Sequence, residues 1–334
     1  MYGTEKDIRR NLFLFFVDGV LFEPGMTLIS ITAVIPFFLE QLGASTIQIA
    51  IAAALTYICC FVAQPFFGSI ATRSRKLHRS FANVLILQRF IFLAFVLSIP
   101  LFINNSAMLV WMFLFFWGVF NFFVGSNNVF YTTLMLKLLP PNKRGMIRGL
   151  GHALGSVLGV GVASLIPVIL NRITFPYNYE VIFSFGLVFL FANSIQFYFM
   201  HEHEDVEPRV PMGIVQYLKG IPESIREDKI FRAMILTCVF LVAANSLLAY
   251  YTLYAIRIFS ATETHIAILA ALAVISSAIG RFGFGVIIDR CGPKTTTIIA
   301  AGFVLSAGLL ALVTNSLNLL FAAWVLANLG KCAY

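Results

Sequence analysis

The feature that most constrains this chain is a series of long apolar stretches, each close to the ~20 residues that an α-helix needs to cross a lipid bilayer. A sliding hydropathy window over the 334 residues finds ten of them. They lie near residues 11–39, 46–70, 81–104, 107–137, 146–170, 180–200, 233–257, 264–288, 294–313 and 316–332. With 60% hydrophobic and 11% charged residues, the chain has too little polar surface for a water-soluble protein of this size. We therefore expect an all-α polytopic integral membrane protein with about ten transmembrane helices.

The basic residues predict how these spans are oriented. If the ten stretches cross the membrane in turn, 19 of the 21 Lys and Arg residues in loops and termini fall on the side that holds the N-terminus. Because Lys-rich and Arg-rich loops stay in the cytoplasm, we expect both termini to be cytoplasmic and the protein to lie in the plasma membrane. This asymmetry and the attraction to anionic lipid account for the net charge of +8, so no nucleic-acid partner is implied.

The longest polar segment, residues 201–232, separates six spans from four. It begins with an acidic run that contains His201 and His203, whose spacing matches no standard metal site and is typical of a solvated linker. Further along it, apolar residues recur at helical intervals, which predicts an amphipathic helix on the inner membrane surface. We therefore predict a six-helix half at 1–200, a cytoplasmic linker at 201–232 and a four-span half at 233–334.

The chain also contains an internal repeat. Residues 49–73 align with residues 266–290 without a gap, and 11 of the 25 positions are identical. The identities include Gly68 with Gly285 and Arg73 with Arg290, which apolar composition does not explain easily. Because an even number of spans separates the copies, both enter the membrane in the same direction. This predicts two parallel helical repeats, an arrangement known from the halves of transporters.

The repeat ends in a motif that resembles a known family. The turn from Gly285 to Lys294 has a Gly, an Asp289-Arg290 pair, a second Gly and a basic residue, and it resembles the loop motif of the major facilitator superfamily. The first copy keeps Gly68 and the basic residues but has Thr72 where that family usually has Asp.

The resemblance covers the whole chain and implies a transporter of twelve helices in two sets of six. This chain has only ten expected spans, arranged as six and four. Either it is a fragment or truncated product that lacks the last two spans, which we favour, or its second half works with four.

The physical roles of this motif follow from its residue types. Gly285 would let two helices approach closely, and Asp289 could pair with an Arg or cap a neighbouring helix N-terminus. Arg290 would lie at the anionic inner face of the membrane. We expect Gly285, Asp289 and Arg290, with Gly68 and Arg73 in the first copy, to form gating loops. The alternative is a charged turn that only fixes topology.

Asp18, Glu23 and Arg89 fall inside the expected spans, where an ionised group costs about 2.5–3.5 kcal/mol. Asp18 and Arg89 lie at similar depth, which predicts a pair, structural or in contact with solute. Glu23 lies deeper, directly before Pro24 and Gly25, where we expect the helix to break. We expect Glu23 to bind solute or to load and release a proton. The alternative is a carboxylate that only faces a water-filled vestibule.

Polar side chains also line one face of the fourth span. Trp117, Asn121 and Asn128 recur at helical spacing and should face a cavity or another helix, so solute binding and helix packing both explain them. Asn245 in the seventh span offers a similar polar surface. We include all four in the expected proton and substrate pathway.

Several function classes find no support in the sequence. It has no phosphate-binding motif and no combination of nucleophile, base and metal ligands at membrane depth, so we expect neither an enzyme nor a bound cofactor or metal. Its five cysteines have no paired spacing. His152 in the fifth span is either a proton relay or, more in keeping with its place, a packing residue.

Together these observations predict a secondary active transporter. We expect a monomer that moves a small organic solute across the bilayer by alternating access, coupled to protons. The alternative is a non-transporting membrane sensor or scaffold, or an inactive fragment, of the same architecture.

Overall fold

The computed structural model describes residues 4–31, 34–203, 214–246, 251, 254–255, 258–259 and 263–333. Most of these residues are helical, and no strand occurs among them, which confirms the expected all-α class. Seven of the described helical segments are long and apolar enough to cross a membrane. The chain forms two compact units: residues 1–140 with 158–219, and residues 141–157 with 220–334.

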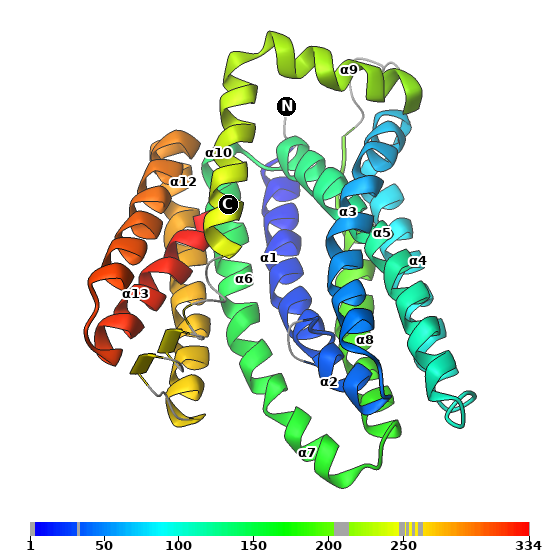
Figure 1. The fold of residues 1–334 in the computed structure, drawn as a ribbon. Coiled ribbons are helices and arrows are strands. Elements are labelled where there is room, and N and C mark those ends of the chain that lie inside the picture. Colours follow the sequence, from blue (N-terminus) through cyan, green and yellow to red (C-terminus); the bar gives the residue numbers. More distant parts are fainter. Residues whose placement is uncertain are drawn as a thin grey trace. The chain divides into compact units, whose positions relative to one another are not determined.

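The first unit contains most of the long helices (Figure 1). They are α1 (Glu5–Leu28), α2 (Val34–Gln41), α3 (Thr46–Arg73), α4 (Leu77–Ser98), α5 (Ser106–Leu138), the second part of α6 (Pro141–Ala163), α7 (Leu165–Arg172), α8 (Tyr177–Ile195) and the 3-10 helix η1 (Gln196–Phe199). Within the unit α3 packs on α5, α5 on α4, α4 on α8, and α8 on α1. Capping boxes begin two of these helices, with Thr4 and Asp7 at α1 and Ser45 and Gln48 at α3.

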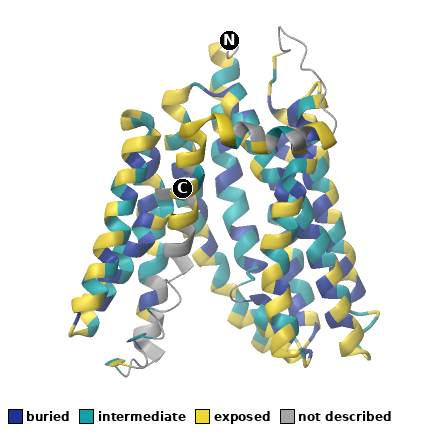
Figure 2. Cartoon of the chain, turned by 45° about the horizontal axis from the view of Figure 1, so that its top comes forward, coloured by how far each residue is buried: buried dark blue, intermediate teal, exposed yellow. Residues whose placement is uncertain are grey.

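Aromatic side chains fill the core of the first unit. The Phe38 ring meets Phe95, Phe113 and Phe183 edge to face at centroid distances of 5.3–6.1 Å. Aromatic pairs of this geometry each contribute roughly 0.5–1.5 kcal/mol beyond the area that they bury. The apolar periodicity thus produces a packed bundle, in which the interior positions are dark in Figure 2.

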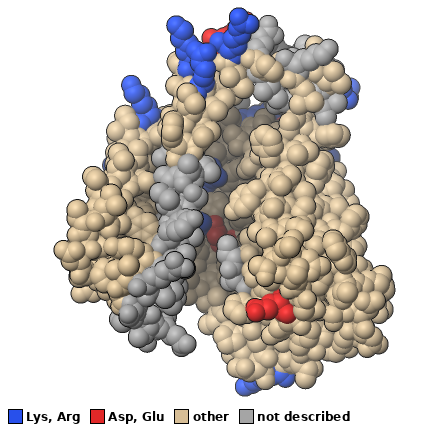
Figure 3. All heavy atoms as spheres, in the orientation of Figure 1, with Lys and Arg blue, Asp and Glu red and all other residues tan. Residues whose placement is uncertain are grey.

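The outer surface of the first unit is also apolar. Large side chains such as Phe61 and Trp111 are more than half exposed. Figure 3 shows that uncharged residues cover most of the visible face of this unit. A large apolar surface is the pattern expected of helices that face lipid.

The first predicted span, residues 11–39, is two helices in the structure. The expected break at Pro24 is wrong, because α1 continues through Pro24 and ends at Leu28. Gly25 instead allows close packing: a Cβ there would lie 2.8 Å from the Leu190 side chain and 3.2 Å from the Gly186 carbonyl oxygen of α8. Neighbouring helices compensate for the backbone hydrogen bond that a proline removes in a membrane helix, so the helix is not interrupted.

The second unit contains the first part of α6, the second part of α9 (Ile214–Glu227), α10 (Lys229–Ser246), α12 (Glu263–Val313), α13 (Leu317–Gly330) and η2 (Lys331–Ala333). α12 bends sharply at Gly292, whose φ of 78° is favoured only by glycine, so it comprises two helices that match the eighth and ninth predicted spans. α13 packs on α12, and the Trp324 indole donates to the Leu269 carbonyl at 2.8 Å. α9 lies where the amphipathic linker helix was predicted.

Candidate functional site

A cavity of about 280 Å³ lies beside Glu23 within the first unit. It is lined by Glu23, Met26, Thr27, Ser30, Val34, Ala163 and Ile166. These residues come from the end of α1, the segment that leads into α2, and the region where α6 passes into α7. The cavity therefore lies where α1 stops, one turn beyond the proline where the break was expected.

The wall of this cavity depends on a close approach of α1 and α6. The Thr27 hydroxyl donates to the Glu23 carbonyl at 2.8 Å. A Cβ at Gly159 would lie only 2.8 Å from that same hydroxyl oxygen, so glycine is required for the observed spacing. Gly159 thus allows α6 to approach α1 closely at this point.

A buried polar network joins α1, α4 and α8. The Asn193 Nδ2 donates to the Asp18 carboxylate at 2.8 Å and to the Asp18 carbonyl at 3.1 Å. Arg89 is 1% exposed, donates from Nη1 to the Gln88 side chain, and its Nε lies 3.5 Å from the Leu190 carbonyl oxygen. The Arg89 Nη2 finds no hydrogen-bond partner among the described residues.

The sequence predicted a pair of Asp18 and Arg89. The structure buries both residues in one network, and the Asp18 carboxylate attracts the guanidinium electrostatically. The hydrogen bonds that position the two charges come from Asn193 and Gln88, neither of which is among the pathway residues predicted from the sequence. The feature of the sequence that could have indicated these residues is a single amide side chain in an apolar span, because such a group needs a hydrogen-bond partner inside the membrane.

The polar stripe of α5 contains one residue that bonds to a neighbouring helix. The Trp117 indole donates to the Ala52 carbonyl and the Thr56 hydroxyl of α3, both at 3.1 Å. Asn121 donates to the Trp117 carbonyl at 2.8 Å and is buried. Asn128 is exposed, and the Asn245 side chain lies outside the described residues. The packing interpretation therefore accounts for Trp117, whereas the hydrogen bond of Asn121 lies within α5.

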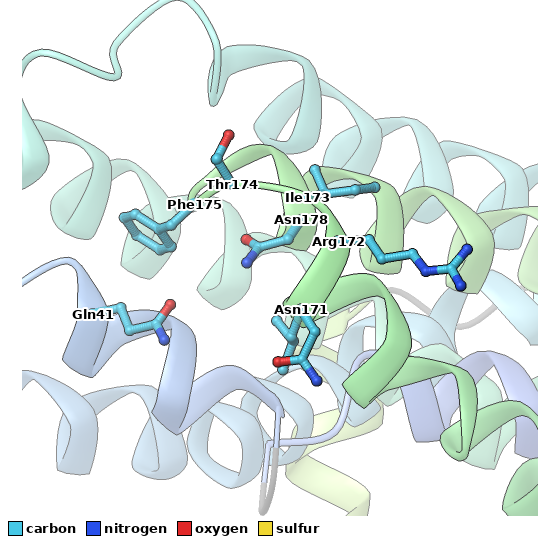
Figure 4. A pocket seen from close by; sticks show the side chains of 8 residues that line it. Gln41, Asn171, Arg172, Ile173, Thr174, Phe175 and Asn178 are labelled. Carbon is cyan, nitrogen blue, oxygen red and sulfur yellow. The ribbon is translucent and has the colours of Figure 1, made fainter.

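A second and larger cavity of about 560 Å³ opens at the junction of α7 and α8 (Figure 4). Gln41 at the end of α2 contributes to one wall, and residues 170–175 with Asn178 form the rest. Amide side chains face this space, while Arg172 extends away from Gln41. This region corresponds to a loop that the distribution of basic residues predicts to be extracellular.

The predicted gating residues of the second copy lie against α6 inside the second unit. The Asp289 carboxylate accepts hydrogen bonds from the backbone N–H groups of Gly145 at 2.8 Å and Met146 at 2.7 Å. A Cβ on Gly285 would collide with the Gly145 backbone, so the glycine allows this contact. Arg290 is exposed. A carboxylate held near a helix N-terminus is stabilised by the helix dipole.

The first copy of the motif lacks this carboxylate contact. Gly68 is buried in α3, and Arg73 at its end is exposed. Thr72, at the position of Asp289, donates instead to the Ser69 carbonyl of its own helix at 2.8 Å. The two copies therefore differ in structure where they differ in sequence.

The start of the linker is not solvated as expected. The Glu202 side chain is 2% exposed and accepts hydrogen bonds from Lys137 at 2.8 Å and from the His78 backbone N–H at 3.0 Å, with His78 Nδ1 at 2.7 Å. Burial alone would raise the pKa of Glu202, but these hydrogen bonds and the Lys137 charge outweigh it and lower the pKa to about 2. The Glu202 carboxylate thus connects the start of α4 with the end of α5.

The sequence from residue 28 to residue 330 matches the MFS_1 like family, a family of the major facilitator superfamily. The chain belongs to this family. The match extends over both structural units, and it confirms the resemblance inferred from the Asp289 turn. No curated protein matches the sequence.

Solved structures of other members of the superfamily have the same fold. FucP in its outward conformation, the fucose:proton symporter of E. coli, aligns with a TM-score of 0.78 at 13% identity over 98% of this chain and 82% of FucP. XylE, a proton:xylose symporter, aligns at 0.67 with 12% identity over 98% and 80%. The human organic anion transporter MFSD10 aligns at 0.61 with 16% identity over 98% and 86%. At these identities the likeness establishes an MFS transporter fold.

Proposed function

We propose that this MFS protein is a proton-coupled secondary transporter that moves a small organic solute by alternating access. The observation that supports the proposal best is the cavity next to Glu23, which places an acidic side chain beside a space large enough for a small solute. The fold shared with two proton symporters agrees with this proposal.

The cavity lining suggests the class of solute. Glu23, Thr27 and Ser30 offer a carboxylate and two hydroxyls, while Met26 and Ile166 are apolar. Hydroxyls and a carboxylate can bind a polyhydroxylated molecule, and apolar side chains can contact its carbon skeleton. We infer a sugar-like solute, for which Glu23 takes up a proton in one state and releases it in another.

Reconstituted vesicles test this function. Purified protein in liposomes with an internal pH dye should acidify the lumen when a transported monosaccharide is added outside, with L-fucose and D-xylose as the first probes. Glu23→Gln should lose this proton flux and retain exchange of radiolabelled solute, because it mimics the protonated form. Glu40→Gln, which changes an exposed carboxylate at the end of α2, is the matched control and should behave as wild type.

Each result has a defined meaning. Solute-driven acidification that survives in Glu23→Gln would contradict the proton role of this residue. If the wild type neither binds nor exchanges any of the monosaccharides, that result would contradict a sugar-like solute. If no class of small organic solute moved at all, a sensor or scaffold function would replace transport.

We also propose that the N-terminus is cytoplasmic and that the protein lies in the plasma membrane. The support is the excess of basic residues on that side of the predicted spans. Single cysteines introduced at Ser106 and Asn315 should react with an impermeant maleimide on intact cells, whereas one at Ser80 should react only after permeabilisation. The reverse labelling would contradict this orientation.

A further inference from the structure

We propose that Asp7, His201 and His203 form a binding site for a divalent transition-metal ion such as Zn²⁺. The His203 Nε2 lies 3.4 Å from Asp7 Oδ2, and the His201 Nε2 lies 3.9 Å from Asp7 Oδ1. All three ligand atoms lie within 4.8 Å of one another. Two imidazoles and a carboxylate are a ligand set that Zn²⁺ uses in proteins.

The backbone after η1 places the two imidazoles together. Side chains in an extended segment alternate in direction, so residues two apart lie on the same side. The structure follows this pattern: the His201 and His203 side chains are 48% and 44% exposed, while Glu202 between them is buried against His78 and Lys137. The two rings lie 4.9 Å apart, and both face Asp7.

The ligands are also held in position before any ion binds. Asn11 is fully buried and pairs with the His201 backbone, donating to its carbonyl at 2.9 Å and accepting from its N–H at 3.0 Å. Asp7 is held by the capping box at the start of α1, where the Thr4 N–H donates to its carboxylate at 3.2 Å. Preorganised ligands lower the entropy cost of binding.

The distances suit a tetrahedral ion after a small adjustment. Zn–N and Zn–O bonds of about 2.0–2.2 Å at tetrahedral angles separate neighbouring ligands by roughly 3.4 Å. The distance of 3.4 Å from His203 Nε2 to Asp7 Oδ2 already matches this value. His201 Nε2 lies 3.9 Å from the other oxygen, Oδ1, so its half-exposed ring has to move closer to share the same ion. The exposed side of the cluster leaves room for a water molecule as the fourth ligand. A bound ion would link the first turn of α1 to the chain segment that leaves η1.

The full chain, purified in detergent with a tag that contains no histidine and stripped of metal by chelation, tests the site. Titration of Zn²⁺ against a fluorescent chelator should give one ion per chain, with micromolar or tighter affinity that Mg²⁺ does not compete away. Asp7→Asn and His203→Ala should each weaken this binding at least about tenfold. Glu5→Gln is the matched control, since it removes a carboxylate from the same turn that pairs only with Arg9 at the surface, and it should bind as wild type.

A second measurement keeps the result independent of folding. His203 lies outside any helix, so the His203→Ala protein without metal should have the thermal stability of the wild type. Only the increase in Tm with Zn²⁺ should disappear. X-ray absorption of the loaded protein should show nitrogen and oxygen ligands. Sulfur ligands, which Cys59 and Cys60 could supply, or equal binding by His203→Ala and wild type, would overturn the proposal. If Asp7 and the histidines form only a surface ion pair, the protein would bind no Zn²⁺ with micromolar affinity. That result would also overturn the proposal.

Discussion

Asn193 donates two hydrogen bonds to Asp18, one to its carboxylate at 2.8 Å and one to its backbone carbonyl at 3.1 Å. Both residues are buried, and the contact joins α8 to α1 in the core of the first unit. A carboxylate in such a place needs donors, because losing one leaves a buried polar group without compensation. Asn193 is therefore part of what keeps an acidic residue tolerable inside this bundle.

Removing that donor should destabilise the protein. Asn193→Leu keeps the side-chain size but cannot donate, and we expect it to lower the stability by about 1–3 kcal/mol. Asn193→Asp should be worse, since it places a second carboxylate beside the first. Thermal unfolding in detergent measures both, with Asn171→Leu at an exposed position as control. An unchanged Tm in Asn193→Leu would show that the hydrogen bonds contribute nothing to stability.

The electrostatic interaction of Asp18 with Arg89 predicts coupling between the two residues. Replacing either charge alone, as in Asp18→Asn or Arg89→Gln, leaves the other buried with less compensation, so each single change should be strongly destabilising. The double variant should be less destabilised than the sum of the single losses, by roughly 0.5–3 kcal/mol. A double-mutant cycle on thermal unfolding measures this difference. Additive losses would mean that the two charges act independently.

The cluster around Glu202 predicts a dependence of stability on acid pH. Its pKa is lowered from an ordinary 4.5 to about 2 in the folded protein, so the carboxylate favours folding above pH 4.5. This contribution, about 3 kcal/mol, should decline as the pH falls from about 4.5 toward 2. Unfolding measured between pH 6 and pH 3 should show Glu202→Gln less stable than wild type at pH 6, with the gap narrowing on acidification. Glu5→Gln should follow the wild-type curve, and a constant gap for Glu202→Gln would contradict this linkage.

The contact of Asp289 with α6 predicts a role for Asp289 in holding α6 and α12 together that the neighbouring Arg290 does not share. Asp289→Asn keeps the shape but loses the negative charge near the helix N-terminus, a loss of about 0.3–1 kcal/mol, and should shift how readily α6 and α12 separate. We expect faster maleimide labelling of a cysteine placed at Met146 in this variant. Arg290→Gln, which changes an exposed side chain, should label at the wild-type rate. Equal labelling of both variants would favour a turn that only fixes topology.

The sequence by itself determined the fold class and the transporter family. Apolar stretches of membrane length permit only helices, because every backbone polar group must be satisfied within the bilayer. The repeat and the Gly285 to Lys294 turn were enough to identify the superfamily, since they are read from residue order alone. The positions of Asp18 and Arg89 in their spans predicted a similar depth, because depth in a bilayer follows from position in the span, and both residues are buried in the structure.

Only the tertiary structure decided which partners these residues have. Helix spacing places Trp117 on a face, but whether that face meets a cavity or α3 depends on how the helices pack, and it meets α3. Glu202 looks like a solvated charge in the sequence, yet it is buried because His78 and Lys137, 124 and 65 residues away, supply its hydrogen bonds. The cluster of Asp7 with His203 is equally invisible in sequence, since helix packing alone brings the start of α1 next to the end of η1. Contacts between distant segments depend on the packing of the whole unit, which no local pattern encodes.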